Sequence, residues 1–225
     1  MSRLMTEDEI GAFEQKYGYK PTFYKIALDA LAIYVNKRNP VRGLTLQQVD
    51  GIFSSTLKSD RPSLETWGSV GVSGDWAKKA ITLYGRNNVS GTNAYFKEHV
   101  LRQGDFKTTV NEEISEQVVE SVANDPSGIG YSGIGWKTSQ VRTVPLGATA
   151  GNFVEPTYKN SLDRTYPLAR FLYIYVNQKP GQPLDKETGE FIRYVLSHEG
   201  QEAVVQAKFF PLPANFVTET LSGKN

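Results

Sequence analysis

The chain has 225 residues, of which 39% are apolar and 22% charged, a balance typical of a folded globular protein and not of a disordered one. It carries 25 Lys and Arg against 24 Asp and Glu, so no net field would attract nucleic acid or an acidic membrane surface, and any anion must be bound locally. Cysteine is absent, which excludes thiolate catalysis, disulfides and cysteine-bound zinc.

No stretch approaches the roughly 18 consecutive apolar residues that a membrane span needs. The first eight residues, MSRLMTED, lack the apolar core of a signal peptide. We therefore expect either a cytoplasmic protein or one whose natural N-terminus is missing from this chain.

The N-terminal third predicts a helix, a strand and a second helix. Acidic residues at 7–9 precede apolar residues at helical spacing, which predicts an amphipathic helix ended by Gly18. The apolar run 26–36 predicts a buried strand. Thr45, with Gln48 three residues later, has the spacing of a capping box and predicts a helix that begins there.

The middle of the chain alternates strands and helices, which predicts the α/β class. A strand is expected at 80–84, a helix at 92–101 and another around residues 118–122. A glycine-rich strand and turn at 128–135 and a strand at 142–146 follow, and then a loop runs to about residue 163.

The C-terminal part predicts a second long apolar strand at 169–177 and one long helix at 185–207, with Phe191, Val195 and Val204 on its buried side. The sequence Ile-Tyr-Val-Asn occurs at 33–36 and again at 174–177. Repeats this short also arise by chance in unrelated core strands. The alternative is that they mark two neighbouring strands that link two lobes.

A turn between a strand and a helix carries the best candidate for a binding site. Ser90, Gly91 and Thr92 fall at the predicted helix N-terminus, where backbone N–H groups lack partners and the dipole favours an anion. Arg86 adds a planar fork that can make two parallel bonds to phosphate oxygens. The competing interpretation is a simple Ser90 helix cap beside a solvated arginine.

The free energy that this turn can supply is too small for a complete site. Two charge-assisted hydrogen bonds from the arginine and the helix dipole give roughly 4 to 7 kcal/mol. A micromolar site requires about 8 kcal/mol. The turn is therefore expected to be half of a site that a second set of donors completes.

Several segments extend this pattern over nearly the whole chain. The turn Gly85 to Thr92 resembles the Gly-Arg-x-x-x-Ser-Gly-Thr signature of the phosphate-binding subgroup of type II periplasmic binding proteins. The other segments that are similar to this family are Leu44 to Ser54, Trp67, Gly128 to Gly135, Tyr166 to Arg170, Leu172 to Asn177, Glu199 to Glu202 and Phe210 to Pro213.

The resemblance implies a two-lobed type II fold with two hinge-crossing strands. Lobe 1 would comprise residues 1–35 and 172–225, and lobe 2 residues 36–171, so that the Ile-Tyr-Val-Asn segments belong to the hinge strands. Phosphate would bind between the lobes, with Arg86, Ser90, Gly91 and Thr92 on lobe 2.

Two departures from the family bear on the site. The family's N-terminal strand and its Ser/Thr-rich turn have no counterpart in this chain, so lobe 1 is expected to be incomplete at its N-terminus. Ser2 and Arg3 are placed near the cleft by their family position, but Arg3 cannot accept the proton of monohydrogen phosphate, and discrimination against sulfate is left unexplained. Asn88 stands where some members have an aspartate that pairs with the arginine.

Other residue patterns in the sequence indicate no metal site, no cofactor site and no catalytic site. His99 and His198 lie far apart, without a second imidazole at ligand spacing. Ser132 lacks the Gly-x-Ser-x-Gly order of a nucleophile elbow. The Gly-x-Gly runs lack a dinucleotide fingerprint, and a close-packed strand explains them better.

The resemblance thus implies a monomeric periplasmic or cell-surface protein that is not an enzyme, uses no cofactor, binds inorganic phosphate and delivers it to a membrane-embedded ABC permease. The alternatives are a non-transport signalling or structural protein that retains the fold, and a phosphate-ester hydrolase that uses the same anion site.

Overall fold

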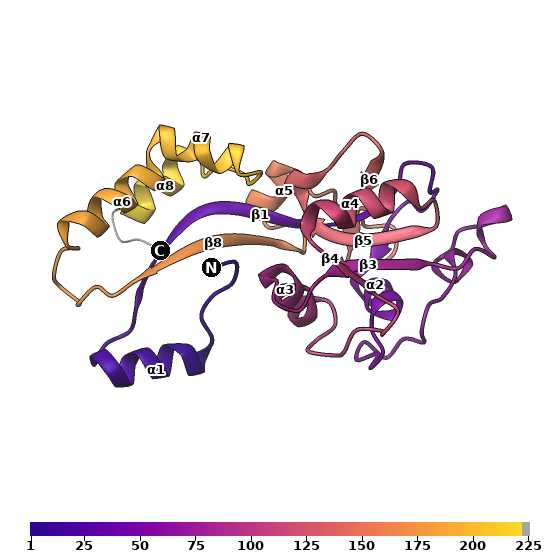
Figure 1. Cartoon of the computed structure of the whole chain (residues 1–225), viewed down its shortest axis with the longest axis horizontal. Helices are drawn as coiled ribbons and strands as arrows, with labels where there is room; N and C mark the ends of the chain where they lie inside the picture. Colours follow the sequence, from indigo (N-terminus) through magenta and orange to yellow (C-terminus); the bar gives the residue numbers. More distant parts are fainter. Residues whose placement is uncertain (222–225) are drawn as a thin grey trace. The chain divides into compact units, whose positions relative to one another are not determined.

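The computed structural model describes residues 1–221 (Figure 1). The chain divides into two compact units: unit 1 comprises Met1–Asp29 and the chain from Arg170 onward, and unit 2 comprises Ala30–Ala169. The unit boundaries therefore fall at 29/30 and 169/170. Residues 222–225, which belong to the predicted segment 172–225 of lobe 1, lie outside the described residues. That the two units act as hinged lobes stays a prediction.

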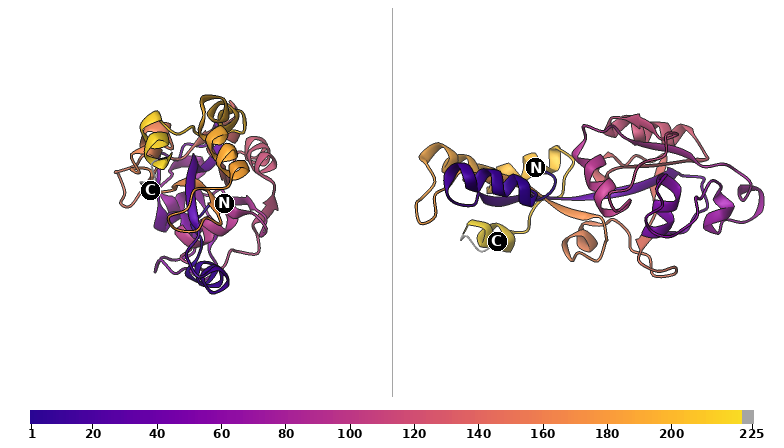
Figure 2. Two further views of the ribbon diagram at one scale, coloured as in Figure 1. Left: turned by 90° about the vertical axis from the view of Figure 1, so that its left-hand side faces the viewer. Right: turned by 90° about the horizontal axis from the view of Figure 1, so that it is seen from below.

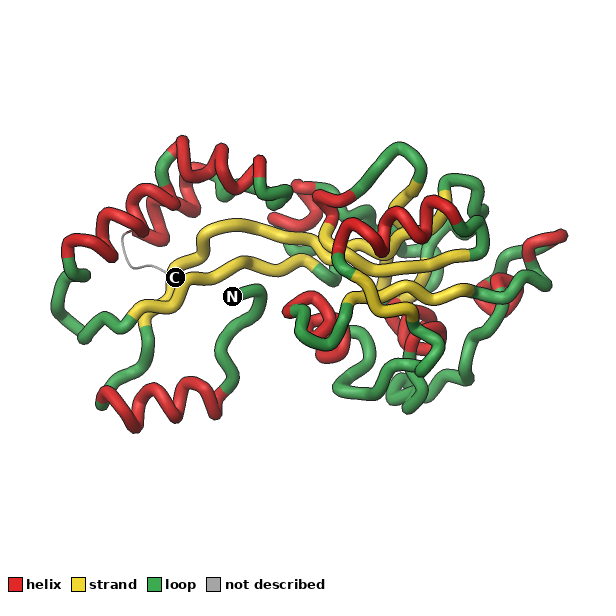
Figure 3. Tube along the Cα trace, viewed as in Figure 1, coloured by secondary structure: helices red, strands yellow, loops and turns green. Residues whose placement is uncertain are grey.

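Most strands form one mixed sheet, in the order β4-β3-β5-β1-β6, with β8 also paired to β1 (Figure 3). Strand β3 is parallel to β4 and β5, whereas β1 is antiparallel to β5 and β6. Two short strands, β2 and β7, form a separate parallel pair. The strands are β1 (Thr22–Asn36), β2 (Leu44–Thr45), β3 (Thr82–Arg86), β4 (Asn111–Glu113), β5 (Gly128–Gly133), β6 (Val141–Thr143), β7 (Leu146–Gly147) and β8 (Ala169–Val176).

Both long apolar strands are confirmed, and they pair with each other. The two Ile-Tyr-Val-Asn segments, however, do not lie at one boundary: residues 33–36 belong to unit 2 and pair with β5 and β6, whereas residues 174–177 belong to unit 1. The echo thus identifies the paired strands but not the position where the chain passes from one unit to the other.

Helices cover both faces of the sheet in unit 2. On one face α4 (Ser115–Asn124) packs Val119 and Val122 against Ala32 and Tyr34 of β1. On the other face the ring of Tyr131 stacks on Phe96 of α3 (Gly91–His99) at 4.0 Å and contacts Phe53 of α2 (Leu46–Phe53) at 5.6 Å between centroids. Alternate residues of each strand therefore contribute to two separate apolar layers, as expected of an α/β unit.

The glycine-rich strand is closely packed, as its sequence predicted. A Cβ on Gly130 would lie 2.8 Å from Cγ1 of Val118 and 2.9 Å from Cγ2 of Val122. The missing side chain lets α4 approach β5 directly. Any larger residue would push the helix away from the sheet.

The first two helices lie where the sequence predicted them. Thr6 caps α1 (Glu7–Tyr17), which can be followed in indigo in Figure 2, and Thr45 caps α2 (Leu46–Phe53) through a complete capping box. The helix after the turn, α3 (Gly91–His99), ends two residues earlier than predicted. Short 3-10 turns occupy Trp67–Val70, Gly74–Trp76 and Ile134–Trp136.

Three predictions for the last third of the chain need correction. The expected long helix is two helices, α6 (Lys186–Leu196) and α7 (His198–Gln206). They separate at Ser197, whose backbone is extended and whose hydroxyl accepts a hydrogen bond from Gly200 N at 3.2 Å. Serine competes with helix continuation in this way because its side chain can cap a new helix start.

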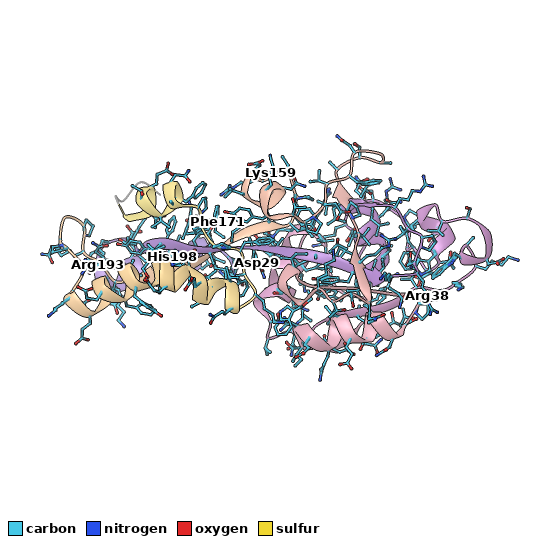
Figure 4. The ribbon with its side chains drawn as sticks, turned by 90° about the horizontal axis from the view of Figure 1, so that it is seen from above. Asp29, Arg38, Lys159, Phe171, Arg193 and His198 are labelled. Carbon is cyan, nitrogen blue, oxygen red and sulfur yellow. The ribbon has the colours of Figure 1, made fainter. Side chains whose placement is uncertain are left out.

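The prediction of which face of this helix is buried was also wrong. Phe191 is 54% exposed, whereas Ile192 and Leu196 are buried. Val195 and Val204 are half-buried. Arg193 of α6 and His198 at the start of α7 are labelled in Figure 4. A shift of one residue in the predicted face turns it by about 100°, which is enough to move Phe191 from the core side of the helix to the solvent side.

The loop that was expected up to residue 163 contains a short helix, α5 (Tyr158–Leu162), because Thr157 caps it by accepting from Asn160 N at 3.1 Å. The predicted strand at 142–146 is divided between β6 and β7. A last helix, α8 (Ala214–Leu221), was not predicted. In the part of the chain that the structure describes, no helix has both the length and the apolar character to cross a bilayer.

A buried ion pair joins β1 and β8 within unit 1. The Nε and Nη2 atoms of Arg170 both donate to Oδ2 of Asp29, at 3.0 and 2.8 Å. Both side chains are almost fully buried (Asp29 is labelled in Figure 4), and the other carboxylate oxygen, Oδ1, has no hydrogen-bond partner among the described residues. Removal of either partner alone would leave an uncompensated buried charge.

Candidate functional site

The candidate site lies in unit 2, where β3 passes into α3. Arg86 is the last residue of β3, and Gly91 is the first of α3. Ser90 is the cap residue, and its hydroxyl oxygen accepts a hydrogen bond from Thr92 N at 3.1 Å. A hydroxyl can accept one bond and donate another. Its capping role therefore does not conflict with a second role as a donor to an anion.

The backbone of Arg86 is held from the core of unit 2. Its carbonyl accepts hydrogen bonds from Asn93 Nδ2 at 2.7 Å and from the Tyr131 hydroxyl at 3.4 Å. Asn93 also donates to the Tyr131 hydroxyl, at 3.2 Å. Tyr131 is fully buried, and desolvation raises the pKa of its phenol well above its usual value, so it stays a neutral donor.

The packing around Gly85 requires a glycine at the position before the arginine. A Cβ at this position would lie 2.8 Å from Cε1 of Tyr131 and 2.8 Å from Cγ1 of Val110. The Tyr131 ring therefore occupies the volume that any other side chain would need. This close approach brings the Tyr131 hydroxyl within reach of the Arg86 carbonyl.

The side chain of Arg86 is held by neutral oxygens of β4 and α4. Its Nε donates to the Glu113 carbonyl at 3.3 Å, and its Nη1 donates to the Ser115 hydroxyl. Arg86 and Glu113 are direct partners in the parallel pairing of β3 with β4. The Glu113 carboxylate does not pair with Arg86: its Oε1 accepts from Ser121, and its Oε2 has no hydrogen-bond partner among residues 1–221.

The topology of this edge suits an anion. Strands β3 and β4 are parallel and end side by side, and each leads into a helix, α3 or α4. Ligands of α/β sheets bind beyond the carboxyl ends of such strands, where helix N-termini also supply unpaired N–H groups and positive partial charge. Arg86, Ser90, Gly91 and Thr92 lie at this edge, between the end of β3 and the first turn of α3.

Ser2 and Arg3 belong to unit 1. Arg3 forms a two-pronged ion pair with Glu9, in which Nη1 lies 2.7 Å from Oε2 and Nη2 lies 2.9 Å from Oε1. Glu9 also accepts from Thr6 N in the capping box of α1. The hydrogen bonds from Arg3 and then from Thr6 lower the pKa of Glu9 to about 2. Ser2 is half-buried.

Sequence reasoning missed Asn93, Ser115 and Tyr131. Asn93 follows the Ser-Gly-Thr motif directly and could have been suspected from that position. Ser115 lies 29 residues after Arg86, and only the pairing of β3 with β4 brings it close. The available signal was a serine at the start of a helix that follows a short polar strand.

Comparison with known proteins places the chain in a family. A family model described as a PBP superfamily domain matches residues 1–199. The chain is also 53% identical over 224 residues to the phosphate-binding protein PstS of Pseudomonas aeruginosa, a match that covers 98% of this chain and 69% of that protein. The chain therefore belongs to the PBP superfamily and, within it, to the family of this phosphate-binding protein, which confirms the membership that the motifs predicted.

Solved structures with low sequence identity show the same fold. A possible phosphate binding protein from Planctomyces limnophilus is 24% identical with a TM-score of 0.74, and the match covers 99% of this chain and 78% of that chain. An ABC-type phosphate transport receptor from Vibrio cholerae is 24% identical with a TM-score of 0.72, covering 95% of this chain and 78% of that one. The predicted type II binding-protein fold is confirmed.

Proposed function

We propose that this chain binds inorganic phosphate as the substrate-binding protein of an ABC importer. The observation that carries the proposal is the Arg86 guanidinium, held by neutral partners beside the N-terminus of α3 at the end of two parallel strands. The name of the 53% identical relative, a phosphate-binding protein, supports phosphate as the ligand. It favours transport over a signalling or structural role.

The ligand would be bound by charge-assisted and backbone donors. Arg86 supplies the cationic fork, Ser90 and Thr92 supply hydroxyl donors, and Gly91 lets an oxyanion approach the first turn of α3. Because the arginine bonds and the helix dipole supply roughly 4 to 7 kcal/mol, less than the about 8 kcal/mol of a micromolar site, the site needs further donors. Ser2 and Arg3 are proposed for this role.

Delivery to a membrane-embedded ABC permease follows from the same relationship. The Vibrio cholerae structure that shares the fold is described as an ABC-type phosphate transport receptor. We accordingly propose a periplasmic or cell-surface location, a monomeric state and binding without catalysis. Turnover of a chromogenic phosphate ester by the purified chain would contradict the last of these.

Substitution of Arg86 tests the site. Arg86→Ala removes the only side chain of the turn with a formal positive charge, so calorimetry should detect no phosphate binding at concentrations that saturate the unchanged chain. Arg38→Ala, which removes an exposed arginine outside the turn, is the matched control and should bind as the unchanged chain does. Equal affinity of the Arg86→Ala variant would show that the turn is not the phosphate site.

A further inference from the structure

We propose that Ser115 is a positioning residue for the bound anion: its hydroxyl fixes the plane of the Arg86 guanidinium without neutralising its charge. The inference rests on the proposed function, because it assigns Ser115 a part in the same site. Ser115 acts through Arg86 and is not itself proposed as a ligand.

Two contacts define the orientation of the guanidinium. Its Nε donates to the Glu113 carbonyl at 3.3 Å, and its Nη1 donates to the Ser115 hydroxyl. A planar group bonded through two different nitrogens cannot rotate about its long axis without breaking one of the bonds. Because a guanidinium has five N–H donors, these two contacts fix its plane while leaving donor capacity for an anion.

Ser115 is itself held in place by the core of unit 2. Its carbonyl accepts a hydrogen bond from the Ser132 hydroxyl at 3.1 Å, and Ser132 is fully buried on β5. Ser115 is also the first residue of α4. Two hydrogen bonds therefore connect the sheet core to Arg86, one between Ser132 and Ser115 and one between Ser115 and Arg86. Both serines lie on regular elements, and such support makes a binding geometry rigid.

The Ser115 hydroxyl is not used to cap its helix. The cap position of α4 is occupied by Ile114, which makes no side-chain capping bond. A serine one residue further on could have been a mere helix starter, but its hydroxyl is bonded to Arg86 instead. The hydroxyl at the start of α4 is thus placed to hold Arg86 and not to cap the helix.

The neutrality of the partner matters for the chemistry of the site. A carboxylate at this distance would orient Arg86 equally well but would cancel much of its charge. The Glu113 carboxylate accepts from Ser121 and makes no bond to Arg86. The hydroxyl and the carbonyl that hold the guanidinium carry no opposing charge.

The test compares phosphate affinity with stability in serine variants of unit 2. Ser115→Ala should weaken the calorimetric Kd for inorganic phosphate about tenfold, the effect of losing one hydrogen bond to a charged group, with an unfolding midpoint close to that of the unchanged chain. Ser69→Ala removes an exposed hydroxyl outside the site and should leave the Kd unchanged. Ser115→Thr keeps the hydroxyl and should restore the Kd.

The outcomes separate this inference from the proposed function. If the unchanged chain binds phosphate and Arg86→Ala does not, but Ser115→Ala binds normally, the positioning role is wrong and the phosphate site stands. If Ser115→Ala lowers affinity and Ser115→Thr fails to restore it, the effect is structural and the inference is overturned. If the unchanged chain itself does not bind phosphate, the proposed function fails, and this inference fails with it.

Discussion

At the scale of residues, the Arg86 turn combines a charged side chain with hydrogen-bond partners that include two carbonyl-binding side chains, a backbone carbonyl and a hydroxyl. Its carbonyl is bound by Asn93 and Tyr131, and its guanidinium by the Glu113 carbonyl and the Ser115 hydroxyl. The sequence motif alone assigns Arg86, Ser90, Gly91 and Thr92 to one turn, because they lie within seven residues of each other at a helix start. It could not predict the supports that come from other elements, which are Tyr131 of β5, Glu113 of β4 and Ser115 of α4.

Gly85→Ala should destabilise unit 2. The new Cβ would lie 2.8 Å from both Tyr131 and Val110, and overpacking of this kind costs about 1 to 3 kcal/mol. Denaturant unfolding measures the change. Gly11→Ala on α1 is the control, because a Cβ there meets no atom within 4 Å, and it should be neutral or stabilising by up to about 1 kcal/mol. Equal unfolding free energies for the two variants would contradict the packing argument.

At the scale of elements, local signals were reliable and distant ones were not. The acidic residues 7–9 and the capping box at Thr45 involve neighbouring residues, so sequence spacing alone predicted both helix starts. The break at Ser197 was also signalled locally but was missed: residues 197–202, Ser-His-Glu-Gly-Gln-Glu, interrupt the apolar pattern, and serine can cap a new helix. The Asp29–Arg170 pair joins residues 141 positions apart, and nothing local to either residue indicates the other.

The capping box of α1 predicts a pH dependence. Glu9 has a pKa lowered to about 2 in the folded chain by Arg3 and Thr6, against about 4.5 for a free glutamate. A lowered folded pKa stabilises the fold above the unfolded pKa, and the contribution is lost as the pH falls from about 4.5 to about 2. Unfolding free energies of the unchanged chain and Glu9→Gln should therefore differ at pH 7 and converge near pH 2.

The matched control for that comparison is Glu14→Gln, which removes an exposed carboxylate from the same helix. Its difference from the unchanged chain should be smaller than that of Glu9→Gln at pH 7. A Glu9→Gln difference that is constant from pH 7 to pH 2 would show that the Arg3–Glu9 pair adds nothing to stability.

At the scale of the whole molecule, the α/β class and the family could be predicted because characteristic segments recur in order along the chain. The position of the unit boundary could not, since it depends on which parts of two long strands pack with which unit. The chain spans 69% of the length of its 53% identical relative.

The central claim is that the turn from Arg86 to Thr92 makes this chain a phosphate-binding protein. Calorimetric titration of the purified chain with inorganic phosphate tests it most directly. We expect a saturable signal that fits one site per chain. A titration that shows no saturable heat across the micromolar to millimolar range would contradict it.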